Sequence, residues 1–142
     1  TLLARERVLP LYLEAKVAFV PNVIYDILLY SKQRGPISIS AKTSLREHYK
    51  QADLEAIALK YVHRKALCFL VTLQATEAAH VQDKILHSEV IGVDRVVVAA
   101  APEFDQFTAD LQKENYIEAP TIDVIQAGLK VTAAAVAAAR NI

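Results

Sequence analysis

Several residue types that organise proteins are scarce in this chain. Its 142 residues include one cysteine, three glycines and neither methionine nor tryptophan. Since Cys68 is alone, an internal disulfide framework and a cysteine-based zinc cluster are excluded. Gly35, Gly92 and Gly128 belong to no glycine-rich loop of the kind that cradles phosphates. The usual nucleotide-binding signatures are therefore missing.

Long apolar runs are missing too. No run reaches the roughly 18 residues that a membrane-spanning helix needs, and Arg5, Glu6 and Arg7 stand where a secretion signal would be apolar. We therefore expect no membrane partner. Hydrophobic residues make up 54% of the chain, enough for one packed domain over residues 1–142. Because the first residue is not methionine, we expect a processed product or one domain of a larger protein.

Charge is balanced over the chain but not along it. Sixteen basic and sixteen acidic residues give a net charge of zero, which argues against a general nucleic-acid binder. Residues 32–65, however, carry eight basic and three acidic side chains, whereas residues 66–142 carry five and ten. Such a basic segment is typical of a polyanion-binding surface, and equally of a solvated helix face.

Hydrophobic periodicity and turn residues divide the chain into helices and strands. We expect helices over residues 3–18, 44–62, 75–90 and 102–114 and from Thr121 to about Arg140, and strands over residues 23–31, 36–43, 66–73 and 94–101. The first two strands are joined by a turn, residues 32–35, in which Gly35 can adopt a positive φ. This order predicts an α/β fold with a mixed central β-sheet flanked by helices.

Polar residues share one face of the predicted hairpin. Because side chains alternate along a strand, Ser38, Ser40 and Lys42 lie on one face. With the turn centred near Arg34, Asp26 and Lys42 become direct cross-strand neighbours. Such a pair suits a metal-assisted site, in which the Asp holds a divalent cation and the Lys positions or deprotonates a water. On these two residues alone, a cross-strand ion pair is the simpler interpretation.

Basic residues recur at the start of the next helix. Ser44 and Glu47 form a capping box, but Arg46 is a cation in a first turn, where acids are favoured. Lys42, Arg46 and Lys50 stand four residues apart. A phosphate or a guanine edge would explain this spacing.

The rest of this helix has an apolar stripe and a polar side. The stripe consists of Leu45, Tyr49, Ala52, Ala56 and Leu59. His48, Gln51 and Glu55 lie beside one another at spacings of three and four. Glu55 borders a nearly apolar stretch, so its carboxylate needs a partner, which can be a metal, Lys42 or an arginine.

An Asp on one strand, a short hairpin and a second strand ending in SISAK resemble the PD-(D/E)XK nuclease fold over about residues 20–75. That motif normally has an acid two residues before the Lys, where this chain has Ser40. The EcoRII-like and NgoMIV-like branch of type II restriction endonucleases shows the same loss and recruits a Glu from the following helix, 13 or 14 residues after the Lys. Glu55 stands 13 residues after Lys42. Tyr25 precedes Asp26 where the motif has Pro.

The resemblance implies a restriction-endonuclease-like core and a Mg²⁺-dependent endonuclease that leaves 5′-phosphate and 3′-hydroxyl ends. Asp26 and Glu55 would bind the metal together with the backbone carbonyl of Ala41, and Lys42 would activate the attacking water. Glu14 is a candidate for an additional acid.

The same resemblance implies double-stranded DNA as the substrate, a homodimer, and a prokaryotic cytoplasm. In the family, residues four, six and nine positions after the Lys read G·C pairs. With Lys50 added for its spacing, the expected DNA contacts are Arg46, His48, Lys50 and Gln51.

Two other interpretations stay open. Ser40 can mark a decayed site, which would leave a non-catalytic DNA-binding or assembly module. Alternatively, the hairpin Asp26 and Lys42 are structural in an unrelated small α/β enzyme or subunit. We expect Cys68 to belong to the core, and the histidines outside the helix start have no zinc-binding spacing.

Overall fold

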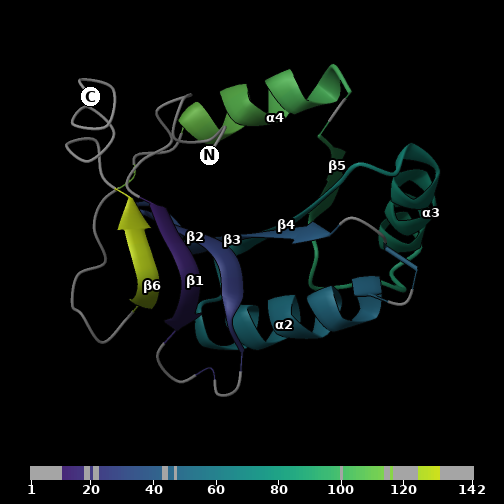
Figure 1. Ribbon diagram of the computed structural model, residues 1–142. Coiled ribbons are helices and arrows are strands. Elements are labelled where there is room, and N and C mark those ends of the chain that lie inside the picture. The colour runs from purple at the N-terminus through teal and green to yellow at the C-terminus, as the bar shows by residue number, and fades with distance from the viewer. Residues whose placement is uncertain are drawn as a thin grey trace.

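The computed structural model describes residues 11–17, 20, 23–42, 45–46, 48–99, 101–113, 116 and 125–131. Figure 1 shows a central sheet with helices on both of its faces. The elements in chain order are β1 (Leu11–Val17), β2 (Tyr25–Ser31), β3 (Gly35–Lys42), α2 (His48–Val62), β4 (Leu67–Thr72), α3 (Ala75–Leu86), β5 (Arg95–Val98), α4 (Glu103–Gln112) and β6 (Ile125–Val131).

All six strands form one sheet, in the order β5-β4-β3-β2-β1-β6. β3, β4 and β5 run parallel and are connected through α2 and α3. β2 is antiparallel to both of its neighbours, and β6 is antiparallel to β1. The predicted mixed α/β class is therefore confirmed.

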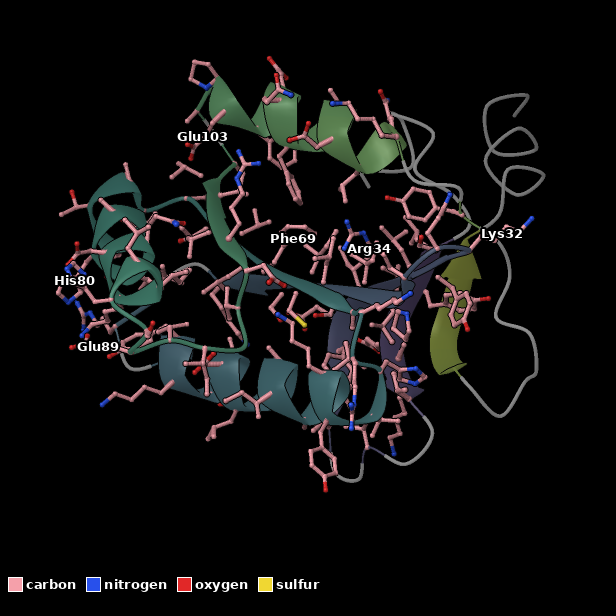
Figure 2. All side chains as sticks on the ribbon, turned by 180° about the vertical axis from the view of Figure 1, so that it is seen from behind. Lys32, Arg34, Phe69, His80, Glu89 and Glu103 are labelled. Carbon is pink, nitrogen blue, oxygen red and sulfur yellow. The ribbon has the colours of Figure 1, made fainter. Side chains whose placement is uncertain are left out.

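Two hydrophobic cores fill the space between the sheet and its helices. Residues of α2 and α3, such as Leu59 and Val81, pack with the sheet residues Leu28 and Leu70 in the larger core. The smaller core lies beneath α4 on the opposite face (Figure 1). It includes Phe107 of α4, whose ring meets that of Phe69 edge-on, with centroids 5.0 Å apart. Figure 2 places Phe69 between the sheet and α4.

The central strands follow the sequence pattern closely. In β4, Cys68, Leu70 and Thr72 are buried against the α2 side, while the alternate residues are half-buried. The predicted apolar strand is thus fully covered on one face and partly on the other. The expected helices over residues 75–90 and 102–114 end earlier, at Leu86 and Gln112.

The two outer strands correct the sequence prediction. The helix expected over residues 3–18 is wrong where the structure describes it, because Leu11–Val17 form β1. The helix expected from Thr121 to Arg140 is likewise wrong over Ile125–Val131, which form β6. β1 pairs with β2 on one side and with β6 on the other. These long-range ladders outweigh the local helix preference of residues such as Leu, Ala and Lys.

A glycine allows the connection between α3 and β5 to lie directly against α2. A Cβ atom at Gly92 would come within 2.7 Å of the Asp53 carbonyl oxygen and within 2.7 Å of the Ile57 amide nitrogen. Both are backbone atoms, which cannot move aside as the end of a flexible side chain can. Gly92 is therefore required by the close approach of this segment to α2.

We expect Gly92→Ala to destabilise the protein by about 1–3 kcal/mol, the usual cost of overpacking a filled site. Urea unfolding monitored by circular dichroism would measure the change. Ile91→Ala is a matched control, since the Ile91 side chain is largely exposed and its removal should cost little. Equal stabilities of Gly92→Ala and the parent protein would contradict the close packing.

Candidate active site

The turn of the hairpin sets the register of its two strands. Ser31 pairs with Gly35 across the turn, and Leu28 pairs with Ser38. The Ser31 hydroxyl accepts hydrogen bonds from the backbone amides of Gln33 and Arg34, at 3.2 and 3.3 Å. Gly35 has a φ of 76°, as predicted. The turn is thus centred on Gln33, one residue earlier than expected.

This shift changes the neighbour of Asp26. Continuing the register beyond the last pair, Ile27 with Ile39, places Asp26 opposite Ser40. The prediction that Asp26 lies directly across from Lys42 is therefore wrong by two residues, a diagonal step. The Asp26 carboxylate instead accepts a hydrogen bond from the Ala41 amide at 3.0 Å. Asp26 is exposed and lies next to the residue that precedes Lys42.

Lys42 is the last residue of β3 and is half-buried. It pairs with Thr72 in the parallel ladder of β3 and β4. It also lines a pocket of about 210 Å³ at the carboxyl ends of these strands, together with Ala41, Leu73 and Ala99. The carboxyl ends of parallel strands are where ligands of open α/β sheets commonly bind.

Glu55 lies in the middle of α2 and is half-buried. Its carboxylate accepts a hydrogen bond from the Gln51 side chain at 3.0 Å, which agrees with the predicted polar side of the helix. Its backbone carbonyl accepts a hydrogen bond from the Tyr25 hydroxyl at 2.8 Å. Since Tyr25 precedes Asp26, this bond fastens the Glu55 turn of α2 to the start of β2.

Burial raises the pKa of the Tyr25 hydroxyl well above its usual range, and the nearby thiol of Cys68 and carboxylate of Glu55 raise this pKa further. Tyr25 therefore stays neutral and remains a hydrogen-bond donor near neutral pH. Burial also raises the pKa of the Cys68 thiol to about 11. Cys68 is thus a buried, protonated core residue, as expected, and not a nucleophile.

The four candidate DNA contacts are exposed and lie at or just before the start of α2. Arg46 lies in a turn that leads into α2, where the Tyr49 amide already donates to the Leu45 carbonyl oxygen at 3.1 Å. His48, Lys50 and Gln51 belong to the first turns of α2, directly after Arg46. All four side chains are exposed.

Other candidates have different surroundings. Glu14 is exposed in the strand β1, not in a helix, and has an unusual φ of 49°. Ser44 and Glu47, the expected capping box, lie outside the described residues. The carboxylate of Glu77 on α3 instead accepts the Leu45 amide at 2.7 Å, just before α2.

Asp53 is a buried acid whose role the sequence did not predict. This residue of α2 is only 8% exposed. Its carboxylate accepts hydrogen bonds from the backbone amides of Gly92 at 2.6 Å, Val93 at 3.1 Å and Ile91 at 3.4 Å. The available signal was its position four residues after Tyr49, inside the apolar stripe of the helix. Asp53 is a structural acid, and Glu55, two residues later, is not used in this way.

Among the residues that the structure describes, no three His, Cys, Asp or Glu side chains gather as metal ligands. None of the helices in the described part of the chain has the length and apolar character that a membrane crossing requires. Comparison of the chain with protein-family models, curated proteins and solved structures finds no match.

Asp53 and Glu55 should respond differently to loss of charge. Asp53→Asn should lower the free energy of unfolding by about 1.5–3 kcal/mol, because three backbone amides, two of them in buried hydrogen bonds, lose a charged acceptor. Glu55→Gln should change it by less than about 0.5 kcal/mol, since its partner Gln51 is exposed. Paired urea denaturation curves test this contrast. An equal loss in both variants would mean that Glu55 also supports the fold.

Proposed function

We propose that this protein is a Mg²⁺-dependent endonuclease of the restriction type that cleaves double-stranded DNA. The observation that carries the proposal is the way two contacts link three distant segments. The Asp26 carboxylate binds the Ala41 amide beside Lys42, and the neighbouring Tyr25 binds the Glu55 backbone. The end of β3, the start of β2 and the middle of α2 are thereby tied together.

The donor atoms at this place fit a hard cation. Mg²⁺ prefers oxygen ligands and is usually held by one or two carboxylates, completed by water and substrate phosphate. One oxygen of Asp26 accepts the Ala41 amide, and one of Glu55 accepts the Gln51 amide. A cation would be held by the other oxygen of each carboxylate, with the Ala41 carbonyl oxygen as a third donor. A bound Mg²⁺ would supply charge stabilisation at the scissile phosphate.

Lys42 is assigned the role of orienting the attacking water. Its ammonium group is carried by a half-buried stem, so the nitrogen can be held at a fixed height above the strand end. As the oxygen of this water attacks phosphorus, its proton passes to the surrounding solvent, the bond between phosphorus and the 3′ oxygen breaks, and the 3′ oxygen takes up a proton from solvent. The products carry a 5′-phosphate and a 3′-hydroxyl. The proposed restriction enzyme would act as a homodimer in a prokaryotic cytoplasm.

A second candidate is a non-catalytic DNA-binding or assembly module of the same fold. Ser40 stands where the usual motif has an acid, and it is buried. The Glu55 carboxylate is engaged with Gln51 within its own helix. Both features are compatible with a site that has lost its metal while keeping its basic helix start.

Magnesium-dependent nicking or cutting of plasmid DNA tests catalysis. Asp26→Asn, Lys42→Ala and Glu55→Gln should each reduce the rate by about 100-fold or more, the usual effect of removing a group that acts in proton transfer or metal binding. EDTA should abolish cleavage. Asp105→Asn is the control, since this exposed acid lies on α4, across the sheet from α2. If all three variants cut at the parent rate, the assigned site is contradicted. If the parent protein binds DNA without any cutting, the second candidate is favoured.

Arg46→Ala should weaken binding to a cognate duplex by about tenfold or more, because a bidentate arginine–guanine contact provides about 1–3 kcal/mol of discrimination. Random duplexes should lose less. The melting temperature should stay unchanged, since Arg46 is exposed before the helix proper. Binding to both duplexes across a salt series would measure this, with a substitution of the exposed Lys113 directly after α4, Lys113→Ala, as a control. Equal losses on both duplexes would reduce Arg46 to a phosphate contact, and a lower melting temperature with unchanged binding would make it structural.

A further inference from the structure

The outward face of α2 is unusual for a surface helix. Its inward face carries the expected apolar stripe, which is buried or partly buried. Its outward face nevertheless has large apolar side chains, with Leu54 67% exposed and Tyr61 87% exposed. Lys50, Leu54 and Tyr61 follow at spacings of four and seven residues, so they project from the same side. Arg64 and Lys65 follow in the turn directly after the helix and are also exposed.

This face has exposed cations near both ends. The helix has two acids, but Asp53 is buried on the amides of residues 91–93, and Glu55 is half-buried and bonded to Gln51. The exposed cations are Lys50 near the start of the helix and Arg64 and Lys65 just past its end. An array of cations with an aromatic side chain among them is typical of surfaces that bind a nucleic-acid backbone.

A structural explanation accounts for only part of this pattern. Cations at a helix C-terminus are stabilised by the helix dipole, which suffices for Arg64 and Lys65. It does not explain a nearly fully exposed tyrosine one turn before them. Nor does it explain why exposed cations also precede and begin the helix, at Arg46 and Lys50.

We infer that the DNA duplex lies along the whole outward face of α2, so that Tyr61, Arg64 and Lys65 contact its backbone beyond the residues proposed to read bases. This inference rests on the proposed DNA-cleaving function. The 15 residues of α2 span about 22 Å at about 1.5 Å per residue. That length corresponds to roughly six or seven base pairs at about 3.4 Å per step. One duplex can therefore contact both ends of the helix, with Arg64 and Lys65 on phosphates and Tyr61 against the sugar-phosphate backbone.

Binding of a 30-base-pair duplex of mixed sequence, measured in EDTA across a salt series, tests the inference without cleavage. The double variant Arg64→Ala/Lys65→Ala should bind about tenfold more weakly at low salt. The slope of log K against log salt should fall by about two, since each lost phosphate contact lowers it by about one. Tyr61→Ala should weaken binding several-fold, and Tyr61→Phe should retain most of it if the ring makes the contact.

Lys32→Ala is the matched control, because Lys32 projects from the hairpin tip on the β6 side of the molecule, away from α2 (Figure 2). It should leave the slope almost unchanged. Parent-like binding by the double variant and by Tyr61→Ala would overturn the inference, as would an equal loss in Lys32→Ala. A double variant that melts lower but binds normally would assign Arg64 and Lys65 to the helix dipole alone. If the parent protein binds DNA but does not cleave it in Mg²⁺, and the variants lose that binding, the nuclease proposal is rejected and this surface is supported. If the parent protein does not bind DNA, both proposals are rejected.

Discussion

The Asp53 carboxylate is the interaction on which the position of α2 depends. Much of the buried face of this helix is small, with Ala52 and Ala56 at its centre, and small side chains provide little apolar area for anchoring. Hydrogen bonds from the amides of Gly92 and Val93 to one buried carboxylate supply the missing attachment, because bonds to a charged acceptor are stronger than neutral ones. This attachment acts together with the apolar core and with the bond from the Tyr25 hydroxyl to the Glu55 carbonyl oxygen. A buried acid with a structural task thus contributes to the placement of the acid with the proposed chemical task.

The sequence predicted those segments whose structure follows from their own residues, and it failed for segments whose structure depends on distant strands. The strands around Asp26 and Lys42 have β-branched residues and a glycine turn, and α2 has a clear apolar stripe, so these elements were predicted correctly. β1 contains Leu, Ala, Glu and Lys, which favour helix when considered alone. It is a strand because β2 and β6 satisfy its backbone on both sides. No local pattern contains that information, since β6 is more than a hundred residues away along the chain.

In the candidate site, too, the sequence suggests the residues but not the long-range contacts that arrange them. The sequence predicts Asp26, Lys42 and Glu55 as a set, which stays a prediction, because the arrangement of the three residues depends on details that no spacing rule gives. The Ser31 hydroxyl binds two amides of the turn and moves the centre of the hairpin to Gln33, which changes the cross-strand partner of Asp26. Asp53 was overlooked for a related reason. A carboxylate within an apolar stripe predicts a buried acceptor only once the donors are known, and these lie almost forty residues later.

Several of the described acids of this protein satisfy backbone amides. Asp53 is one case, and the others are Glu77 on the Leu45 amide, Asp94 on the Cys68 amide and Glu103 on the Val98 amide. Each of these carboxylates accepts a backbone amide, so its charge is partly compensated by the backbone dipoles. The basic side chains near α2 have the opposite distribution, since Arg46, Lys50, Arg64 and Lys65 are exposed. A net charge of zero therefore does not argue against a polyanionic partner. A partner at the surface of α2 responds to the local field, and there Asp53 is buried and Glu55 half-buried, while these four cations are exposed.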